Sequence, residues 1–291
     1  MSVRPGWVEG QRAVYEAWSE RTRDEVIRFN NEEREVSYQV RTESRLSWRV
    51  EGVNADGSAV CVMTFEALEL ERKGPGDTEM IAGAGDGMKK GEGPLQDMVE
   101  SVVGKALEFE VEADGTVVSV DGVEAMRKAA ENEALIPSDR DFLRIASELA
   151  VLPGSPEGLT VGASWEHEAV WEGQPVFPRM PSEVETTVET AVAAVGLMGG
   201  VPVATLETQT GLEVRVKRDE LPKDAPPVKA RYVNPEVTSE VYFDLDRREV
   251  VARNEQSDTR LVSELSLPNG VTVEREVTVR ERSQVLRVEA E

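Results

Sequence analysis

The chain has 291 residues, of which 40% are hydrophobic and 5% aromatic, and its 56 acidic residues outnumber 33 basic ones to give a net charge of −23. A negative field of this size repels nucleic acid and anionic membrane surfaces, which argues against both as partners. No run of about 18 apolar residues occurs, so the sequence predicts no transmembrane segment. The length suits one large β unit or two smaller ones with a sizeable core.

Cys61 is the only cysteine and His167 the only histidine. A lone cysteine excludes an intramolecular disulfide, and its apolar neighbours predict a buried structural thiol rather than a nucleophile. One histidine cannot build a histidine-rich metal site. Strand alternation places His167 on the same face as Trp165 and Trp171, which predicts a partly buried packing residue.

In chain order, the first predicted element covers residues 12–29. Apolar residues there occur at helical spacing, but Asn30-Asn31 resembles a hairpin turn, so we favour a strand over a helix. Residues 35–50 carry mostly apolar side chains at even positions and charged or polar ones at odd positions. This alternation predicts a strand of roughly 50 Å with one solvated face. A strand of such length is expected to curve around a core.

Asp56-Gly57 predicts a tight turn into a strand over residues 58–72. Residues 74–93 hold seven glycines and predict a flexible loop. A phosphate-binding loop is not expected there, because Lys89-Lys90 is followed by glycine rather than by Ser or Thr.

Helical signals follow between residues 94 and 150. The predicted elements are a helix opened by Pro94, short strands at residues 106–112 and 116–120, a helix at residues 123–130, and a helix whose start is capped by Ser138 with Asp141.

The chain returns to β structure after residue 159. Alternation predicts strands over residues 184–194 and 206–216, and residues 218–236, with four prolines, predict a connector. Pro268-Asn269-Gly270 marks a hairpin among the last strands. The predicted fold is therefore mainly β, with long curved antiparallel sheets in a half-barrel or a sandwich, and a short helical insertion around residues 94–150.

Similar segments recur along the chain. Residues 57–63 match residues 200–206, and both segments follow a long alternating strand and a turn. Residues 107–112 match residues 241–246, and both are followed by a turn and a Val-Val pair. Such matches are typical of an internal duplication, although strands also resemble one another without common origin.

Two descriptions of the domain organisation remain open. One is a single β-rich unit over residues 1–291. The other is a pseudo-repeat of halves 1–130 and 157–291, joined by a helical segment over residues 131–156.

A resemblance to one bacterial family is carried by four segments: Pro5-Gly6-Trp7-Val8-Glu9-Gly10-Gln11, the Asp56-Gly57 turn, residues 158–165 and the Phe243-Asp244 strand. By this pattern, most of the chain resembles the family named domain of unknown function 6263. It departs from the family at Arg247-Arg248-Glu249, where the family has a turn glycine.

Members of that family are typically exported proteins, often lipoproteins, with no assigned activity. The resemblance implies a periplasmic or cell-envelope location and a removed signal segment, with a cytoplasmic location as the alternative. The predicted curved sheet with a helical insert is also similar, by fold alone, to the lipoprotein-carrier proteins, which implies an apolar ligand held against a concave sheet.

A ligand site is hypothesised on the apolar strand faces. Its residues are Val36, Leu46, Trp48, Trp165 and Trp171. Packing in the core is the alternative role for these side chains, because large rings contribute most when they are buried.

The sequence predicts no catalytic residue, no metal site and no cofactor. No Gly-x-Ser-x-Gly elbow occurs. Asp244-Leu245-Asp246 lacks the glycine of a calcium loop and precedes Arg247-Arg248, and its two carboxylates are expected to face solvent. A non-enzymatic binding or scaffold module, which holds an apolar small molecule or a protein partner, is therefore the expected function. The alternative is a hydrolase whose carboxylates converge only in the folded chain.

Overall fold

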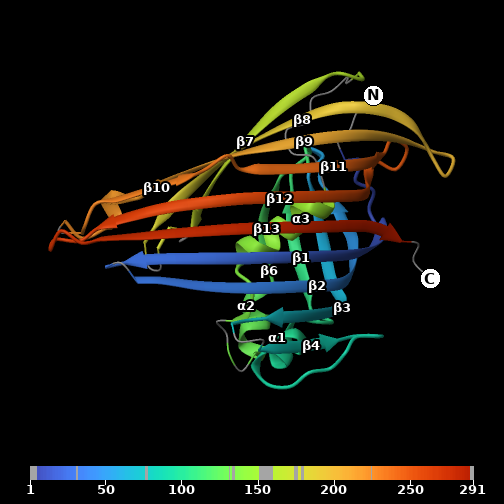
Figure 1. The fold of residues 1–291 in the computed structure, drawn as a ribbon. Helices are drawn as coiled ribbons and strands as arrows, with labels where there is room; N and C mark the ends of the chain where they lie inside the picture. The colour runs from blue at the N-terminus through green and yellow to red at the C-terminus, as the bar shows by residue number, and fades with distance from the viewer. Residues whose placement is uncertain are drawn as a thin grey trace.

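The computed structural model describes residues 5–30, 32–75, 78–130, 132, 135–150, 160–173, 176–177, 180–223 and 225–288, with the backbone alone at residues 140, 148, 150 and 171–173. Within these residues, thirteen strands form one open antiparallel sheet with three α-helices on it (Figure 1). The mainly β fold predicted from the sequence is confirmed, as one large curved sheet rather than two packed sheets.

The strands are β1 (Arg12–Phe29), β2 (Glu32–Val53), β3 (Ala59–Lys73), β4 (Glu79–Ala84), β5 (Ala106–Val111), β6 (Val117–Asp121), β7 (Ser164–Gly173), β8 (Ser182–Met198), β9 (Val201–Val216), β10 (Val228–Tyr232), β11 (Glu236–Asp244), β12 (Glu249–Ser266) and β13 (Thr272–Val288). The helices are α1 (Pro94–Val102), α2 (Val123–Ala129) and α3 (Asp139–Ala150), with a 3₁₀ turn at Arg218–Glu220. The sheet order is β6-β5-β3-β2-β1-β13-β12-β11-β9-β8-β7, and β4 and β10 add to β3 and β12.

The centre of the sheet is built from the longest strands. The strand predicted over residues 35–50 is the middle of β2, and its apolar even positions include Leu46 and Trp48, which are 1% and 5% exposed. The strand alternative for residues 12–29 is correct, because β1 pairs along its length with both β2 and β13. The first and last strands of the chain are thus neighbours in the sheet.

The helices lie on one face of the sheet, which we call the helix side. α3 contacts both β6, at one edge of the sheet, and β12, well inside it. The strands between them therefore curl around the helices (Figure 1). The main core fills this curl, and its largest fully buried side chains include Phe109, Phe142 and Met63.

A second and smaller core cluster lies on the other half of the sheet. Its members are Val192, Ala204, Leu206, Val241, Phe243 and Val250, with Trp165 packed against them. They come from β8, β9, β11 and β12, so each half of the sheet has an apolar centre of its own.

Two segments predicted as irregular contain strands. Residues 79–84 of the glycine-rich segment form β4 on β3, and residues 228–232 of the proline-rich connector form β10 on β12. Gln96 on α1 fixes the glycine-rich segment: its Oε1 accepts the N–H groups of Gly83 and Gly91 at 3.0 and 2.8 Å, and its Nε2 donates to the Gly83 carbonyl. The glycines allow the segment to fold closely on itself, because a Cβ atom at Gly91 would collide with the carbonyl oxygen of Ile81.

The expectation that Asp244 faces solvent is wrong. Asp244 is 3% exposed, and its Oδ1 accepts the N–H groups of Asp246 and Arg247 at 2.8 and 2.9 Å. It therefore caps the turn between β11 and β12, since an aspartate side chain satisfies backbone donors two and three residues onward. Only the second carboxylate, that of Asp246, is exposed.

The two halves share a pairing pattern. The strand series β1-β2-β3-β5-β6 and β7-β8-β9-β11-β12 are both consecutive in the sheet. Cys61 pairs with Phe109 in the first series, and Ala204 pairs with Phe243 in the second, which is the register that the matched segments require. The duplication itself stays a prediction, which this shared register supports.

The turns that lead into the two series also agree. Gly10 donates to the carbonyl of Val50, and Gly162 donates to that of Val192, both at 2.9 Å. No helix in the described part of the chain is long and apolar enough to span a membrane.

Candidate functional site

An apolar pocket of about 220 Å³ lies between α3 and the sheet. Leu46, Phe65 and Leu68 form its floor on β2 and β3, and Phe142 and Ile145 form its roof on α3. The rest of the lining continues this mixture of apolar and small side chains, and includes Ala17, Ser19, Thr42, Ser44, Leu70, Val102, Pro137, Leu149 and Val285. The pocket is therefore enclosed by the same two layers that form the main core.

The position of α3 follows from its sequence. Ser138 and Asp141 form the predicted capping interaction: the Asp141 carboxylate accepts the backbone N–H of Ser138 at 2.9 Å, and the N–H of Asp141 lies 3.3 Å from the Ser138 hydroxyl. Phe142, Ala146 and Leu149 then share one apolar stripe and are at most 2% exposed. This stripe faces the sheet and leaves the pocket beside it.

One end of the pocket is polar. Arg144 of α3 and Glu281 of β13 line it together with Ser283. Glu255 of β12 is paired in register with Ser283 and so lies on the same face of the sheet. Burial raises the pKa of Glu255, an effect that the charge of Arg253 partly offsets and that of Glu281 reinforces. An apolar ligand in the pocket would therefore meet charged groups at this end.

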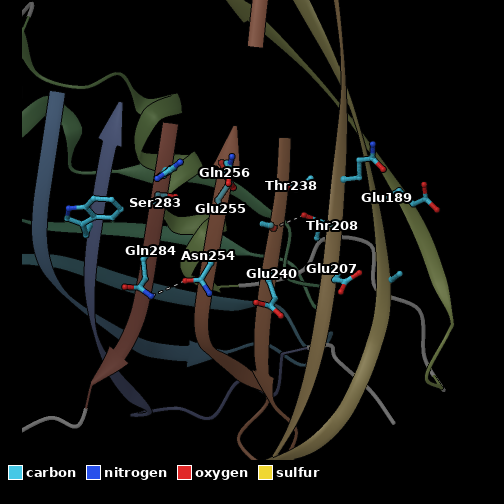
Figure 2. Close-up of a pocket in the computed structure, with 15 residues that line it drawn as sticks. Glu189, Glu207, Thr208, Thr238, Glu240, Asn254, Glu255, Gln256, Ser283 and Gln284 are labelled. Atoms are coloured by element: carbon cyan, nitrogen blue, oxygen red, sulfur yellow. Dashed lines mark hydrogen bonds between the residues drawn. The ribbon is translucent and has the colours of Figure 1, made fainter. Parts of the chain in front are cut away.

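A broader and more open trough of about 700 Å³ lies on the opposite face of the sheet. Gln284, Asn254, Glu240 and Glu207 lie at one level across four neighbouring strands, from β13 to β9 (Figure 2). The amide groups of Gln284 and Asn254 are hydrogen-bonded at 3.0 Å. The trough is thus lined by polar groups, in contrast to the pocket under α3.

The trough brings carboxylates together. Glu207 and Glu240 are directly paired across β9 and β11, and Glu189 lies further along the same surface. Glu207 and Glu189 are exposed, and Glu240 is half-buried. A carboxyl group that acts as an acid catalyst relies on a dry environment. Glu207 and Glu189 are open to solvent, whereas Glu255, which also borders the trough, is the residue whose pKa burial raises. No group of three or more metal-ligating side chains occurs among the described residues.

The structure separates the hypothesised ligand residues. Of the four whose side chains the structure describes, only Leu46 lines the pocket under α3. Trp48 stacks on Phe109 in the main core with ring centroids 5.8 Å apart, and Trp165 packs against the second core cluster. Val36 is half-buried near the N-terminal end of β2.

The side chain of Trp171 is outside the described residues, although its backbone belongs to β7. A ligand role for these five residues as one group stays a prediction.

The structure also shows where the only cysteine and the only histidine of the sequence lie. Cys61 is fully buried, and burial raises the pKa of its thiol to about 12, so it is present as an unreactive thiol. His167 is half-buried on β7 and is paired in register with Val188.

Sequence reasoning missed the pocket residues Phe65, Phe142 and Ile145 as a group. Each carried a local signal, the first in a strand and the others in a capped helix. Their convergence depends on how α3 packs across the curled sheet, which no local pattern encodes.

No protein-family model matches the chain, and no curated protein matches it. Among solved structures, one described as "Lipid-protein interactions in lipovitellin" matches 97% of this chain at 9% identity with a TM-score of 0.41. The chain spans only 26% of that lipovitellin chain.

Two bacterial structures match less well. A DUF1329 family protein from Desulfovibrio piger matches 91% of this chain and 85% of its own at 11% identity, with a TM-score of 0.14. The translocator domain of the autotransporter NalP from Neisseria meningitidis matches 92% of this chain and 88% of its own at 6% identity, with a TM-score of 0.17. These scores are too low to carry an argument about function.

Proposed function

We propose that the protein is a non-enzymatic binding module that holds a small apolar ligand, or one end of an acyl chain, in the pocket under α3. The observation that carries the proposal is the enclosure of an apolar space between Leu46, Phe65 and Leu68 on one side and Phe142 and Ile145 on the other. Ligand sites are typically concave and lined by such side chains, with a few polar groups that orient the ligand.

The size of the pocket limits the ligand. Its volume of about 220 Å³ is below the roughly 300–1,000 Å³ typical of drug-sized sites, but above the roughly 150 Å³ of an apolar cavity that takes up benzene. A ring-sized molecule or a short length of acyl chain fits. A complete two-chain lipid requires more space than this pocket offers.

A hydrolase acting in the trough has one observation in its favour, the direct pairing of Glu207 with Glu240. We give it less weight, because Glu207 is exposed to solvent, whereas a carboxyl group that acts as an acid catalyst needs a dry environment.

Native mass spectrometry and titration with the neutral fluorophore N-phenyl-1-naphthylamine test the proposal. We expect a co-purified apolar adduct, or saturable fluorescence enhancement by the purified protein. Ser44 lines the pocket, so Ser44→Phe should fill it and lower the affinity for the fluorophore at least tenfold. Ser37→Phe is the matched control, because Ser37 is exposed on the other face of the same strand.

Circular dichroism establishes that both variants fold, since overpacking a core has its own cost in stability. Equal binding by wild type and a folded Ser44→Phe variant would contradict the proposal, as would a wild type that carries no adduct and does not enhance the fluorophore.

Membership of the family named domain of unknown function 6263, and with it a cell-envelope location, forms a second part of the proposal. It is supported by the resemblance of residues 5–11 and of the Phe243-Asp244 strand. Fractionation of the native cells with an antibody against the protein would decide it: recovery in the cytoplasm alone would contradict the envelope location.

A further inference from the structure

Another cavity, of about 510 Å³, lies where the chain enters β1 and leaves β13. Its charge is opposite to that of the whole protein. Four arginines, Arg12, Arg247, Arg248 and Arg287, line it against two acidic residues, Asp246 and Glu249. In a chain with a net charge of −23, such a local excess of guanidinium groups is the opposite of what the composition favours.

The floor of the cavity is neutralised internally. The Nη1 atom of Arg287 lies 2.6 Å from Oε1 of Glu249, and Gln11 donates to Oε2 of Glu249 at 3.2 Å. The side chains of Arg287 and Glu249 are 18% and 9% exposed. The main partner of Glu249 is therefore Arg287, below the surface, and its contact with Arg247 on the rim is longer, at 3.9 Å.

The rim is open to solvent. The side chain of Arg247 is 61% exposed and lies 3.9 Å from Glu249, while Arg12 is 53% exposed and pairs with Glu66 at 3.0 Å. Arg248 is exposed, and its guanidinium makes no hydrogen bond or ion pair with the part of the chain that the structure describes.

The backbone at Arg248 is unfavourable for arginine. Its φ of 58° lies in the left-handed region, which glycine adopts freely and residues with a Cβ do not. Gly6 lies against it, and a Cβ atom at position 6 would be 2.5 Å from Cδ of Arg248. The backbone conformation at position 248 thus favours glycine over arginine. Arg248 does not offset this cost with an ion pair to the described part of the chain.

We propose that this arginine cavity, defined by Arg12, Arg247, Arg248 and Arg287, binds a phosphate group. Each guanidinium presents donors in a planar fork that matches phosphate or carboxylate oxygens. A phosphate offers three or more oxygens and more than one negative charge, so it can engage several arginines at once. A single carboxylate has only two oxygens and one negative charge, so it matches a group of arginines less well. The phosphate is that of a soluble ester or of a phospholipid headgroup.

Isothermal titration with inorganic phosphate and with glycerol 3-phosphate at low salt tests the site, beside flotation with vesicles of phosphatidylcholine alone or mixed with phosphatidylglycerol. Saturable binding of the soluble anions without flotation identifies a soluble ester as the ligand. Flotation only with phosphatidylglycerol identifies a lipid headgroup.

Arg248→Gly is the informative variant. It should lower the affinity for phosphate by about tenfold or more, since hydrogen bonds to charged groups are among the strongest. It should leave the urea midpoint unchanged or raise it, because glycine suits the backbone.

Two controls separate charge from backbone effects. Arg231→Ala removes an exposed positive charge on β10, remote from the cavity, and Asn234→Gly changes another left-handed residue, with φ of 45°. Both should bind phosphate as the wild type does.

Three results would overturn the proposal. The first is a wild type that shows no saturable binding of phosphate or of anionic vesicles, and the second is an Arg248→Gly variant with wild-type affinity. The third is an equal loss in Arg231→Ala, which would reduce the effect to diffuse electrostatic attraction.

Discussion

Glu25 on β1 and Arg275 on β13 form an ion pair, with the Arg275 Nε donating to the Glu25 carboxylate at 2.8 Å across 250 positions of the chain. Arg275 is 5% exposed. Its Nη1 donates to the carbonyl of Val176, and its guanidinium lies 5.9 Å from the ring centre of Phe177. One buried cation thus joins the first strand, the last strand and the segment that follows β7.

Replacement of Arg275 by methionine should be strongly destabilising. The change removes the buried partner of the Val176 carbonyl and of the Glu25 carboxylate, whose side chain is 16% exposed. Among the described residues, it leaves Glu25 with Arg23 alone, at 3.1 Å and 41% exposed. Removal of one member of a buried pair costs about 3 kcal/mol, to be measured by urea unfolding. Arg260→Met is the control, because Arg260 pairs with Glu276 but is 50% exposed, and it should cost under about 1 kcal/mol. Similar losses of unfolding free energy in both variants would show that the buried ion pair of Arg275 contributes no more to stability than an exposed one.

The same pair predicts a dependence of stability on acid. Burial alone would raise the pKa of Glu25, but the hydrogen bonds and charges of Arg275 and, to a smaller extent, Arg23 outweigh it, and the net pKa is lowered from the usual 4.5. A carboxylate with a lowered folded pKa contributes stability that is present above its unfolded pKa and is lost as pH falls through the folded one. The difference in unfolding free energy between wild type and Glu25→Gln should therefore be large at neutral pH and should shrink below pH 4.5. A difference that stays constant into acid would contradict this assignment.

Gln96 provides a third prediction. Gln96→Leu removes the partner of two buried N–H groups and one carbonyl in the glycine-rich segment. Because each unsatisfied buried group costs about 1–3 kcal/mol, we expect a loss of about 3 kcal/mol or more in urea unfolding. Gln256→Leu, on the exposed wall of the trough, should change stability by no more than about 0.5 kcal/mol. Protease cleavage within residues 83–91 should accelerate in the first variant only.

Local sequence patterns are sufficient to predict the elements whose structure depends on neighbouring residues. Alternation over residues 35–50 predicts β2, because one face of a central strand must be apolar. The Ser138 and Asp141 pair predicts the start of α3, because both groups satisfy donors of the same first turn. These signals lie within a few residues of each other, and the structure confirms both.

Other features depend on residues far apart in the sequence. The strand β4 lies in a glycine-rich segment with little intrinsic preference for strands, and it forms because β3 and Gln96 supply its partners. Asp244 is buried because it caps a turn, although its residue type predicts exposure. The arginine cavity combines the two ends of the chain with the turn at Arg248. Each of these features depends on which distant strands pair with each other. Local patterns in a single sequence do not reveal that pairing.

Glu255 provides the last prediction, with the opposite sign to Glu25. Its pKa is raised, chiefly by burial. A carboxyl group with a raised folded pKa is most favourable to the fold while protonated, and that contribution is lost as pH rises through the folded pKa. Glu255→Gln, which keeps the shape of the protonated form, should therefore be more stable than wild type at about pH 7.5 and no more stable at about pH 4, as measured by urea unfolding. Glu240→Gln, on the open trough face, is the control. If Glu255→Gln were instead less stable at neutral pH, the attraction between Glu255 and Arg253 would have to exceed the cost of burying the charge.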